Sequence, residues 1–222
     1  MNEDKNSEDF VRLKRALQGF QSERIGQTYQ DLMEDPQYEK IGHFFFNKLY
    51  APDDFSFRDT SIKKLHKLLK GKVYSGMISA VSKVIELHEL SNLLDDRMVE
   101  NMIAMGIGED MDMEEYQAVY RSLDNYDQRL YQIDLGGEVT QAFYKLSKKW
   151  VVALSLKTVR TAAHVIGVGK IIDFVYEGYE GFRAIQNIDY FIETVDTREH
   201  AWHEEIWSTA GKVSGLEMMS NQ

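Results

Sequence analysis

The sequence predicts an all-α protein that folds as a single compact multi-helix bundle of about eight or nine helices. Three observations favour helices. The chain of 222 residues has only two prolines, its apolar residues recur at helical spacing, and the β-branched runs expected of strands are missing. Because 43% of the residues are hydrophobic, the chain can bury a substantial core.

Cap residues and apolar spacing predict the helices of the first half. Ser7 is a good N-cap, and Glu8 and Asp9 fall in the positive first turn of a helix that should end near Pro36. Further helical segments are expected at 38–49, 61–70, 73–94 and 98–105, with turns at 51–54 and Gly71.

Glycines divide the second half of the chain. Gly106 and Gly108 should stop one helix, and Asp112 should cap the next. Gly136-Gly137 predicts a break or kink. The remaining helical segments are expected at 112–123, 128–136, 138–166, 170–179 and 182–208.

The domain boundaries lie at the chain ends. Residues 1–9 form a polar segment that we expect to be disordered, and residues 209–222 are expected to form a flexible C-terminal tail. No linker rich in Pro, Gly or Ser divides the region between them. We therefore expect a single all-α domain at 10–208.

Composition excludes several classes of protein. The absence of cysteine excludes disulfides, Cys-ligated metals and thiol catalysis. The acidic start is unlike a signal peptide, and no apolar run approaches the ~20 residues of a membrane span. The formal net charge of -10 argues against nucleic-acid binding. These features predict a cytoplasmic protein without a transmembrane segment.

The most unusual segment is residues 139–172, which contain no Asp or Glu. On a helical wheel, Lys145, Lys149, Lys157 and Arg160 fall within one arc. The favoured interpretation is a buried central helix whose basic arc meets acidic neighbouring helices. The alternative is an exposed strip that contacts anionic lipid headgroups, an acidic protein or a phosphorylated ligand. Membrane-surface contact is therefore possible but not favoured.

A second local pattern lies near the C-terminus. Glu199 and His203 are spaced i,i+4, as are His200 and Glu204, so each pair can converge on one cation. Imidazole with carboxylate suits zinc, iron or manganese. No second copy of the pattern appears, and the HExxH motif is absent. A solvated helix face with salt-bridged side chains is the favoured interpretation.

Residues 44–59, FFFNKLYAPDDFSFRD, resemble the FFLEELYGPxDFxxRD run of an uncharacterised bacterial family, typically proteobacterial. Residues 181–184 and 191–194 are similar to other recurring segments of that family, which implies no known activity. A helix that ends in Phe-Phe-x-x-Leu-Tyr, as predicted here, is also distantly similar to the region of bacterial globins that leads into the haem pocket. This similarity implies globin-like packing. Met102 stands nearest the position of the proximal histidine, so haem is not expected.

The sequence predicts a helical interaction or regulatory protein without catalytic activity. Its partner would be another protein or a second copy in a homodimer, and no cofactor is predicted. The aromatic content of 12% suits an interface. The alternative is a small-molecule or metal-binding helical protein, possibly enzymatic. It would use a pocket lined by the aromatics between Phe44 and Phe57, or the face with His200 and His203.

Overall fold

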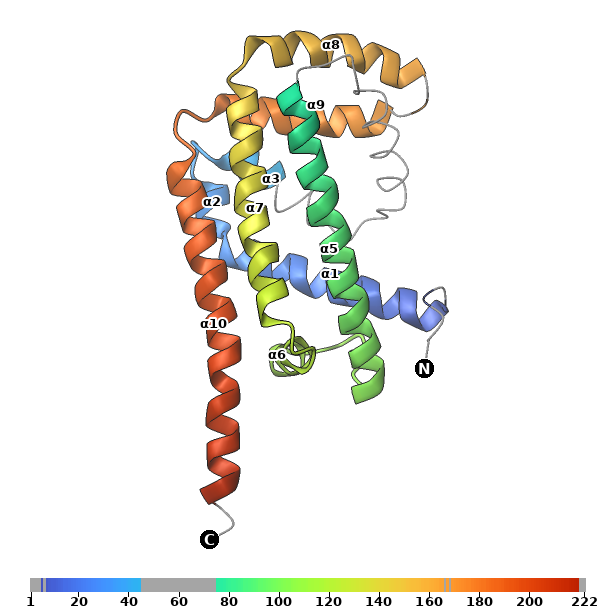
Figure 1. The fold of residues 1–222 in the computed structure, drawn as a ribbon, viewed down its shortest axis with the longest axis vertical. Coiled ribbons are helices and arrows are strands. Elements are labelled where there is room, and N and C mark those ends of the chain that lie inside the picture. The colour runs from blue at the N-terminus through green and yellow to red at the C-terminus, as the bar shows by residue number, and fades with distance from the viewer. Residues whose placement is uncertain (1–4, 6, 45–74, 166, 168, 220–222) are drawn as a thin grey trace.

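The computed structural model describes residues 5, 7–44, 75–165, 167 and 169–219. Every regular element in these ranges is a helix, which confirms the all-α prediction (Figure 1). The nine helices of this part are α1 (Glu8–Thr28), α2 (Gln30–Glu34), α3 (Glu39–Phe44), α5 (Ser75–Met105), α6 (Met113–Ser122), α7 (Tyr126–Ser147), α8 (Trp150–Val165), α9 (Gly169–Ala184) and α10 (Asp189–Met219).

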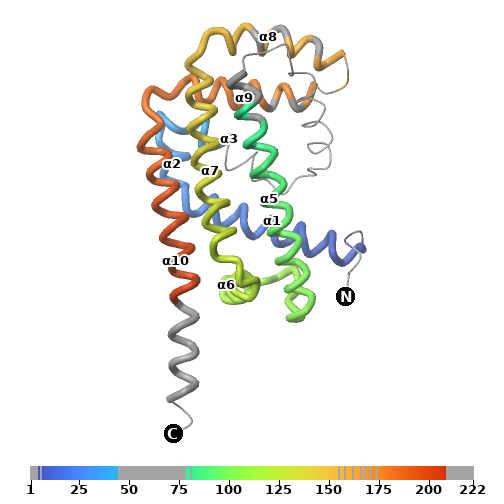
Figure 2. Tube along the Cα trace, viewed as in Figure 1, coloured from blue at the N-terminus to red at the C-terminus, as the bar shows by residue number. Residues whose placement is uncertain are grey.

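Three long helices, α5, α7 and α10, run along the length of the molecule. Helix α7 packs against both α5 and α10, and α1 crosses α5. Helices α8 and α9 pack against each other and lie across one end of the long helices, as the trace in Figure 2 shows. Helix α6 lies near the opposite end, after the C-terminus of α5.

Apolar side chains on α1, α5, α6 and α10 form one of three core clusters. Leu17, Met98, Met102, Val119 and Ile206 are all fully buried in it. Met102 is thus an ordinary core residue at the position compared with the proximal histidine of globins. Burying a side chain of this size stabilises the fold by about 1.5–3 kcal/mol.

Two predicted N-caps are confirmed. The Ser7 hydroxyl accepts a hydrogen bond from the Phe10 N–H at 3.2 Å. Asp112 and Glu115 form a capping box, in which each side chain accepts from the backbone N–H of the other residue. Each cap satisfies N–H groups that lack a partner within the helix.

Glycine was a reliable stop signal only where the backbone adopts a positive φ. Gly106 ends α5 at φ 71°, and Gly167 separates α8 from α9 at φ 78°, as predicted. The predicted break at Gly136-Gly137 is wrong, because α7 continues through both residues. The break expected before Phe182 is also misplaced, because α9 continues to Ala184.

The prediction of one buried helix over 138–166 is wrong as well. The chain turns at Lys148-Lys149, and the segment is divided between α7 and α8. At this corner the Lys148 ammonium donates to the carbonyls of Phe182, Arg183 and Ile185. These carbonyls belong to the end of α9 and the turn after it, where a cation is favourable. Burial lowers the pKa of this ammonium.

The terminal helices reach close to both ends of the described chain. Helix α1 begins at Glu8, directly after the predicted Ser7 cap, and Lys5 forms ion pairs with Asp96 and Glu100. Helix α10 extends to Met219, beyond the predicted helix end at 208. The first predicted helix is interrupted at Tyr29, which separates α1 from α2.

Several predicted features lie outside the described residues: the part of the 38–49 helix after Phe44, the turn at 51–54, the 61–70 helix and Gly71. The motif at 44–59 and the aromatic pocket proposed from it also lie there, except for Phe44. Among the helices that are described, none combines the length and the apolarity needed to cross a bilayer.

Candidate functional site

Helix α8 presents two opposite stripes, one buried and one exposed. The buried stripe contains Val152, Leu156, Val159 and Ala163 at alternating spacings of four and three, and it packs on α9 residues that include Ile172. These contacts hold α8 against the rest of the molecule. They also fix which residues of α8 must face outward.

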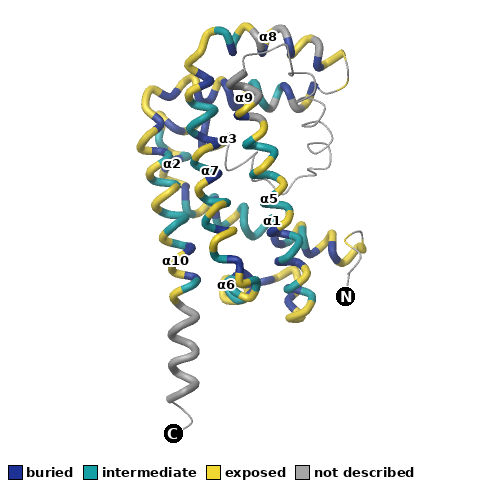
Figure 3. The backbone as a smooth tube through the Cα atoms, in the orientation of Figure 1, coloured by how far each residue is buried: buried dark blue, intermediate teal, exposed yellow. Residues whose placement is uncertain are grey.

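The outward stripe of α8 is both apolar and basic. Trp150 is 78% exposed, Leu154 is 58% exposed and Val165 is 83% exposed. Lys157 lies between these residues along the helix and is also exposed. Figure 3 shows that exposed and buried positions alternate along α8. Large apolar side chains exposed beside lysines on one helix are typical of a binding surface. We call Trp150, Leu154, Lys157 and Val165 the outer α8 stripe.

The four basic residues singled out in the sequence have two different environments. Lys145, Lys149 and Lys157 are exposed at the corner and along α8. The Arg160 guanidinium instead pairs with Asp173 of α9, with 2.7 Å between Nε and Oδ1, and lies over the Tyr176 ring. The basic arc was expected to meet acidic neighbouring helices, and Arg160 does so through an acid of α9.

Asp173 is the first acid after the acid-free segment, and it pairs with two side chains of α8. The His164 Nε2 lies 3.2 Å from its carboxylate, on the same side as Arg160. Hydrogen bonds from His164 and Arg160 lower the pKa of the Asp173 carboxyl. The remaining formal positive charge of α8 is that of Lys157, which belongs to the outer α8 stripe.

The structure does not bring together the four residues proposed as metal ligands. Glu199 accepts from Arg24 and Tyr29, and Glu204 accepts from the Tyr126 hydroxyl. His203 is buried and His200 is half-buried, and the two have different neighbours. Consecutive positions on α10 thus face different partners.

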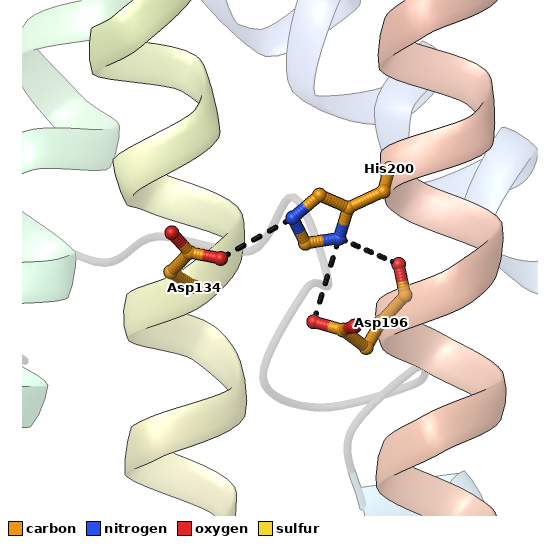
Figure 4. Close-up of side chains that lie close together, drawn as sticks. All are labelled: Asp134, Asp196 and His200. Carbon is orange, nitrogen blue, oxygen red and sulfur yellow. Dashed lines mark hydrogen bonds and ion pairs between the residues drawn. The ribbon is translucent and has the colours of Figure 1, made fainter.

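His200 instead joins two carboxylates that surround it between α7 and α10 (Figure 4). Its Nε2 lies 3.2 Å from Oδ1 of Asp134 on α7. Its Nδ1 lies 2.8 Å from the Asp196 backbone oxygen and 3.4 Å from the Asp196 carboxylate. One ligand atom from each residue lies within 4.8 Å of the others. We call Asp134, Asp196 and His200 the His200 cluster.

The geometry fixes the protonation of one His200 nitrogen. A carbonyl oxygen can only accept, so Nδ1 carries a proton and donates to the Asp196 oxygen. A neutral imidazole would then turn the Nε2 lone pair toward the Asp134 carboxylate, and two acceptors would face each other. A cation between Nε2 and Asp134 would satisfy both acceptors.

His203 belongs to a buried polar network. It is completely buried, and its Nδ1 lies 3.0 Å from the Tyr120 hydroxyl. The Arg129 guanidinium lies over the Tyr120 ring at 4.7 Å. Burial lowers the pKa of the His203 imidazole and raises that of the Asp95 carboxyl, which accepts hydrogen bonds from two glutamine side chains on α1. This network is enclosed by helices, which suits a structural role.

Sequence reasoning missed Asp134, Asp196 and the apolar half of the outer α8 stripe. Asp196 precedes His200 by four residues, so helical spacing could have identified that pair. Asp134 lies on another helix, and no local signal connects it to His200. The apolar character of the segment around Trp150 and Leu154 favours a buried helix, and sequence alone does not show that these two side chains face outward.

Comparison with known proteins identifies one family. The profile of a domain of unknown function (DUF8198) matches residues 1–212. Neither the curated proteins nor the solved structures contain a match to the chain. The globin-like packing expected from the motif therefore stays a prediction.

Proposed function

The chain belongs to the DUF8198 family, and we propose that it is a non-enzymatic binding protein that recruits an anionic partner through the outer α8 stripe and its neighbouring lysines. One observation carries the proposal: Trp150 and Leu154 are exposed beside lysines in the acid-free segment of an acidic protein. Exposing large apolar groups costs solvation free energy, which binding would recover.

The positive charge of this surface favours an anionic partner over a second copy of the chain. A second copy that presented the same stripe across a two-fold axis would bring lysines such as Lys157 against one another. Like charges across an interface cost free energy, so homodimerisation through this surface is disfavoured. An anionic partner gains from the same lysines, while Trp150 and Leu154 supply the apolar contact.

Retention on a column of heparin, a sulfated polyanion, tests whether this surface governs anion binding. The wild-type chain should be retained at low salt despite its net charge of -10, and it should elute as salt rises. Replacing Lys145 and Lys157 with glutamate should abolish retention.

The control replaces Arg15 and Lys40, two exposed basic residues of α1 and α3, with glutamate. This change alters the net charge by the same amount, so the control variant should still be retained. Equal loss in both variants would show that net charge alone decides retention, and failure of the wild-type chain to bind would contradict the proposal.

The His200 cluster supports a second candidate function, the binding of a divalent cation. Zinc at about 2.1 Å from a nitrogen and an oxygen, with an angle of about 100° between them, leaves the two ligand atoms about 3.2 Å apart. That is the distance between Nε2 of His200 and Oδ1 of Asp134. The Nδ1 contact with the Asp196 carbonyl would orient the ring, as such contacts do in histidine–metal sites.

Calorimetric titration with zinc chloride tests this second candidate. The wild-type protein should bind zinc at one site, and His200→Gln or Asp134→Asn should abolish that binding. His164→Gln is the matched control, because His164 pairs with one aspartate, Asp173, on other helices. The absence of zinc binding, or zinc binding that persists in both His200→Gln and Asp134→Asn, would contradict this second candidate.

A further inference from the structure

Charge is divided between the α8 end of the molecule and the rest. Residues 139–172 contain six basic residues and no acid, which gives this segment a formal charge of +6 and leaves -16 elsewhere in a chain of net charge -10. Such a separation orients the whole molecule in the field of an anionic partner, with α8 foremost. We therefore expect the α8 end of the molecule to meet an anionic partner first.

The position of α8 indicates the shape of the partner. Helix α8 lies across the end of α5 and α7 and is the outermost described helix there (Figure 1). Its outer stripe therefore runs along the end of the molecule and can lie flat on a plane. A plane of anionic groups meets the whole stripe at once, whereas a protein would need a shape that matches a single convex helix.

The composition of the stripe fits the interface of a bilayer. Trp150 has an apolar ring and a polar N–H, a combination suited to the headgroup level. Leu154 and Val165 can enter the acyl boundary, while Lys157 extends its ammonium to the phosphates. An amphipathic helix with Trp and Leu beside lysines lies in the plane of the membrane and does not span it.

We propose that the outer α8 stripe binds the surface of an anionic phospholipid bilayer, with α8 parallel to the membrane and Trp150 at the headgroup boundary. This inference rests on the proposed function and names its partner. Each lysine near an anionic membrane surface contributes about fivefold in affinity, and this contribution weakens as salt screens the surface charge.

Co-sedimentation of the full chain with vesicles tests the inference. Vesicles with about 30% phosphatidylglycerol in phosphatidylcholine should bind the protein at low salt, and pure phosphatidylcholine vesicles should not. Replacing Lys145 and Lys157 with glutamine should weaken binding by about thirtyfold, at about 1 kcal/mol per charge. The matched control, Arg15→Gln with Lys40→Gln, should bind nearly as the wild type does.

Insertion of Trp150 gives an independent readout. Lipids brominated on the acyl chain near the headgroup should quench the fluorescence of the wild-type protein on the vesicles. The variant Trp150→Phe should lose that quenching, although it keeps Trp202 and Trp207, which lie on α10. Quenching that persists in Trp150→Phe would place another part of the chain at the membrane and overturn the inference.

The heparin column and the vesicle experiment together distinguish failure of the proposed function from failure of the lipid inference. Retention on the heparin column without binding to phosphatidylglycerol vesicles would overturn the lipid inference and leave an acidic protein as the partner. If the wild-type protein neither is retained on heparin nor binds phosphatidylglycerol vesicles, both proposals are overturned. Equal binding to neutral and anionic vesicles would also overturn the inference, because the lysines would then have no part in it.

Discussion

Arg24 and Glu199 form a bidentate ion pair between α1 and α10, with Nη1 at 3.0 Å from Oε1 and Nη2 at 2.9 Å from Oε2. Both side chains are largely buried, and the Arg24 guanidinium also lies over the Trp202 ring at 4.2 Å. Burial alone would lower the pKa of Arg24, but the charge of Glu199 outweighs it and raises that pKa. The pair thus joins the N-terminal helix to the C-terminal one.

The first prediction concerns this pair. Glu199→Gln should lower the free energy of unfolding by about 3 kcal/mol, because it leaves a buried guanidinium without a counter-charge. Arg24→Met combined with Glu199→Gln should cost less than the sum of the two single changes, since no charge is then left unpaired. Urea denaturation of the four proteins measures both effects.

A neighbouring pair provides the control. Arg198 and Asp31 also join α10 to the N-terminal region, at 2.7 Å, but the Asp31 side chain is 52% exposed. Solvent screens this pair, so Asp31→Asn should cost less than about 1 kcal/mol. Equal losses from Asp31→Asn and Glu199→Gln would contradict the importance given to burial.

The second prediction is a pH dependence of stability that comes from His203. Burial lowers the pKa of this imidazole below its ordinary 6.5, so the unfolded chain binds the proton more tightly than the folded chain. The contribution of His203 to stability should therefore be constant above about pH 6.5. It should decrease as the pH falls below that value, by up to about 1.4 kcal/mol per pH unit.

Urea unfolding between about pH 5 and pH 8 measures this dependence. His203→Gln removes the titrating group and can still form a hydrogen bond with Tyr120, so its stability should fall less steeply below pH 6.5. Identical pH profiles of the wild type and the variant would show that other groups cause the dependence.

Helix type, most caps and much of the core could be predicted from sequence because these depend on local chemistry. The Ser7 cap is an example, since a hydroxyl before an apolar periodic segment needs only neighbouring N–H groups. The stop at Gly106 is another example. Both signals act within one turn of helix.

The failures arose where packing between distant segments decides the outcome. A helix with apolar residues around much of its circumference suits a buried position, yet α8 packs by one stripe only and leaves Trp150 exposed. Similarly, the His200 cluster needs Asp134 from α7 beside α10, and the spacing of residues on α10 says nothing about α7. The predicted break at Gly136-Gly137 is wrong for a related reason, since both glycines lie within α7.

The third prediction uses the helical position of Gly137. A Cβ atom added there would meet no atom within 4 Å, and the residue lies in the middle of α7. Gly137→Ala should therefore raise the free energy of unfolding by about 0.5–1 kcal/mol, because alanine loses less conformational entropy in a helix. Gly106→Ala should have the opposite sign, because its φ of 71° strains an L-residue. Destabilisation by Gly137→Ala would indicate that α7 is interrupted there.

The fourth prediction concerns Gly178, which α9 presents to the Phe44 side chain of α3. A Cβ atom at this position would lie 2.7 Å from Cζ of Phe44, too close for any real contact. Gly178→Ala should therefore destabilise the protein by about 1–3 kcal/mol, as overpacking of a core does, even though alanine is the better helix former. Differential scanning calorimetry measures the loss.

Gly181 supplies the comparison on the same helix, since a Cβ atom there would meet Ile41 at an ordinary 3.4 Å. Gly181→Ala should change stability by less than about 1 kcal/mol, because the entropic gain in the helix offsets any small adjustment. Adding Phe44→Leu to Gly178→Ala should recover part of the loss, since the shorter side chain leaves room for the new methyl group. Equal effects at Gly178 and Gly181, without recovery by Phe44→Leu, would mean that α3 does not approach α9 at Gly178.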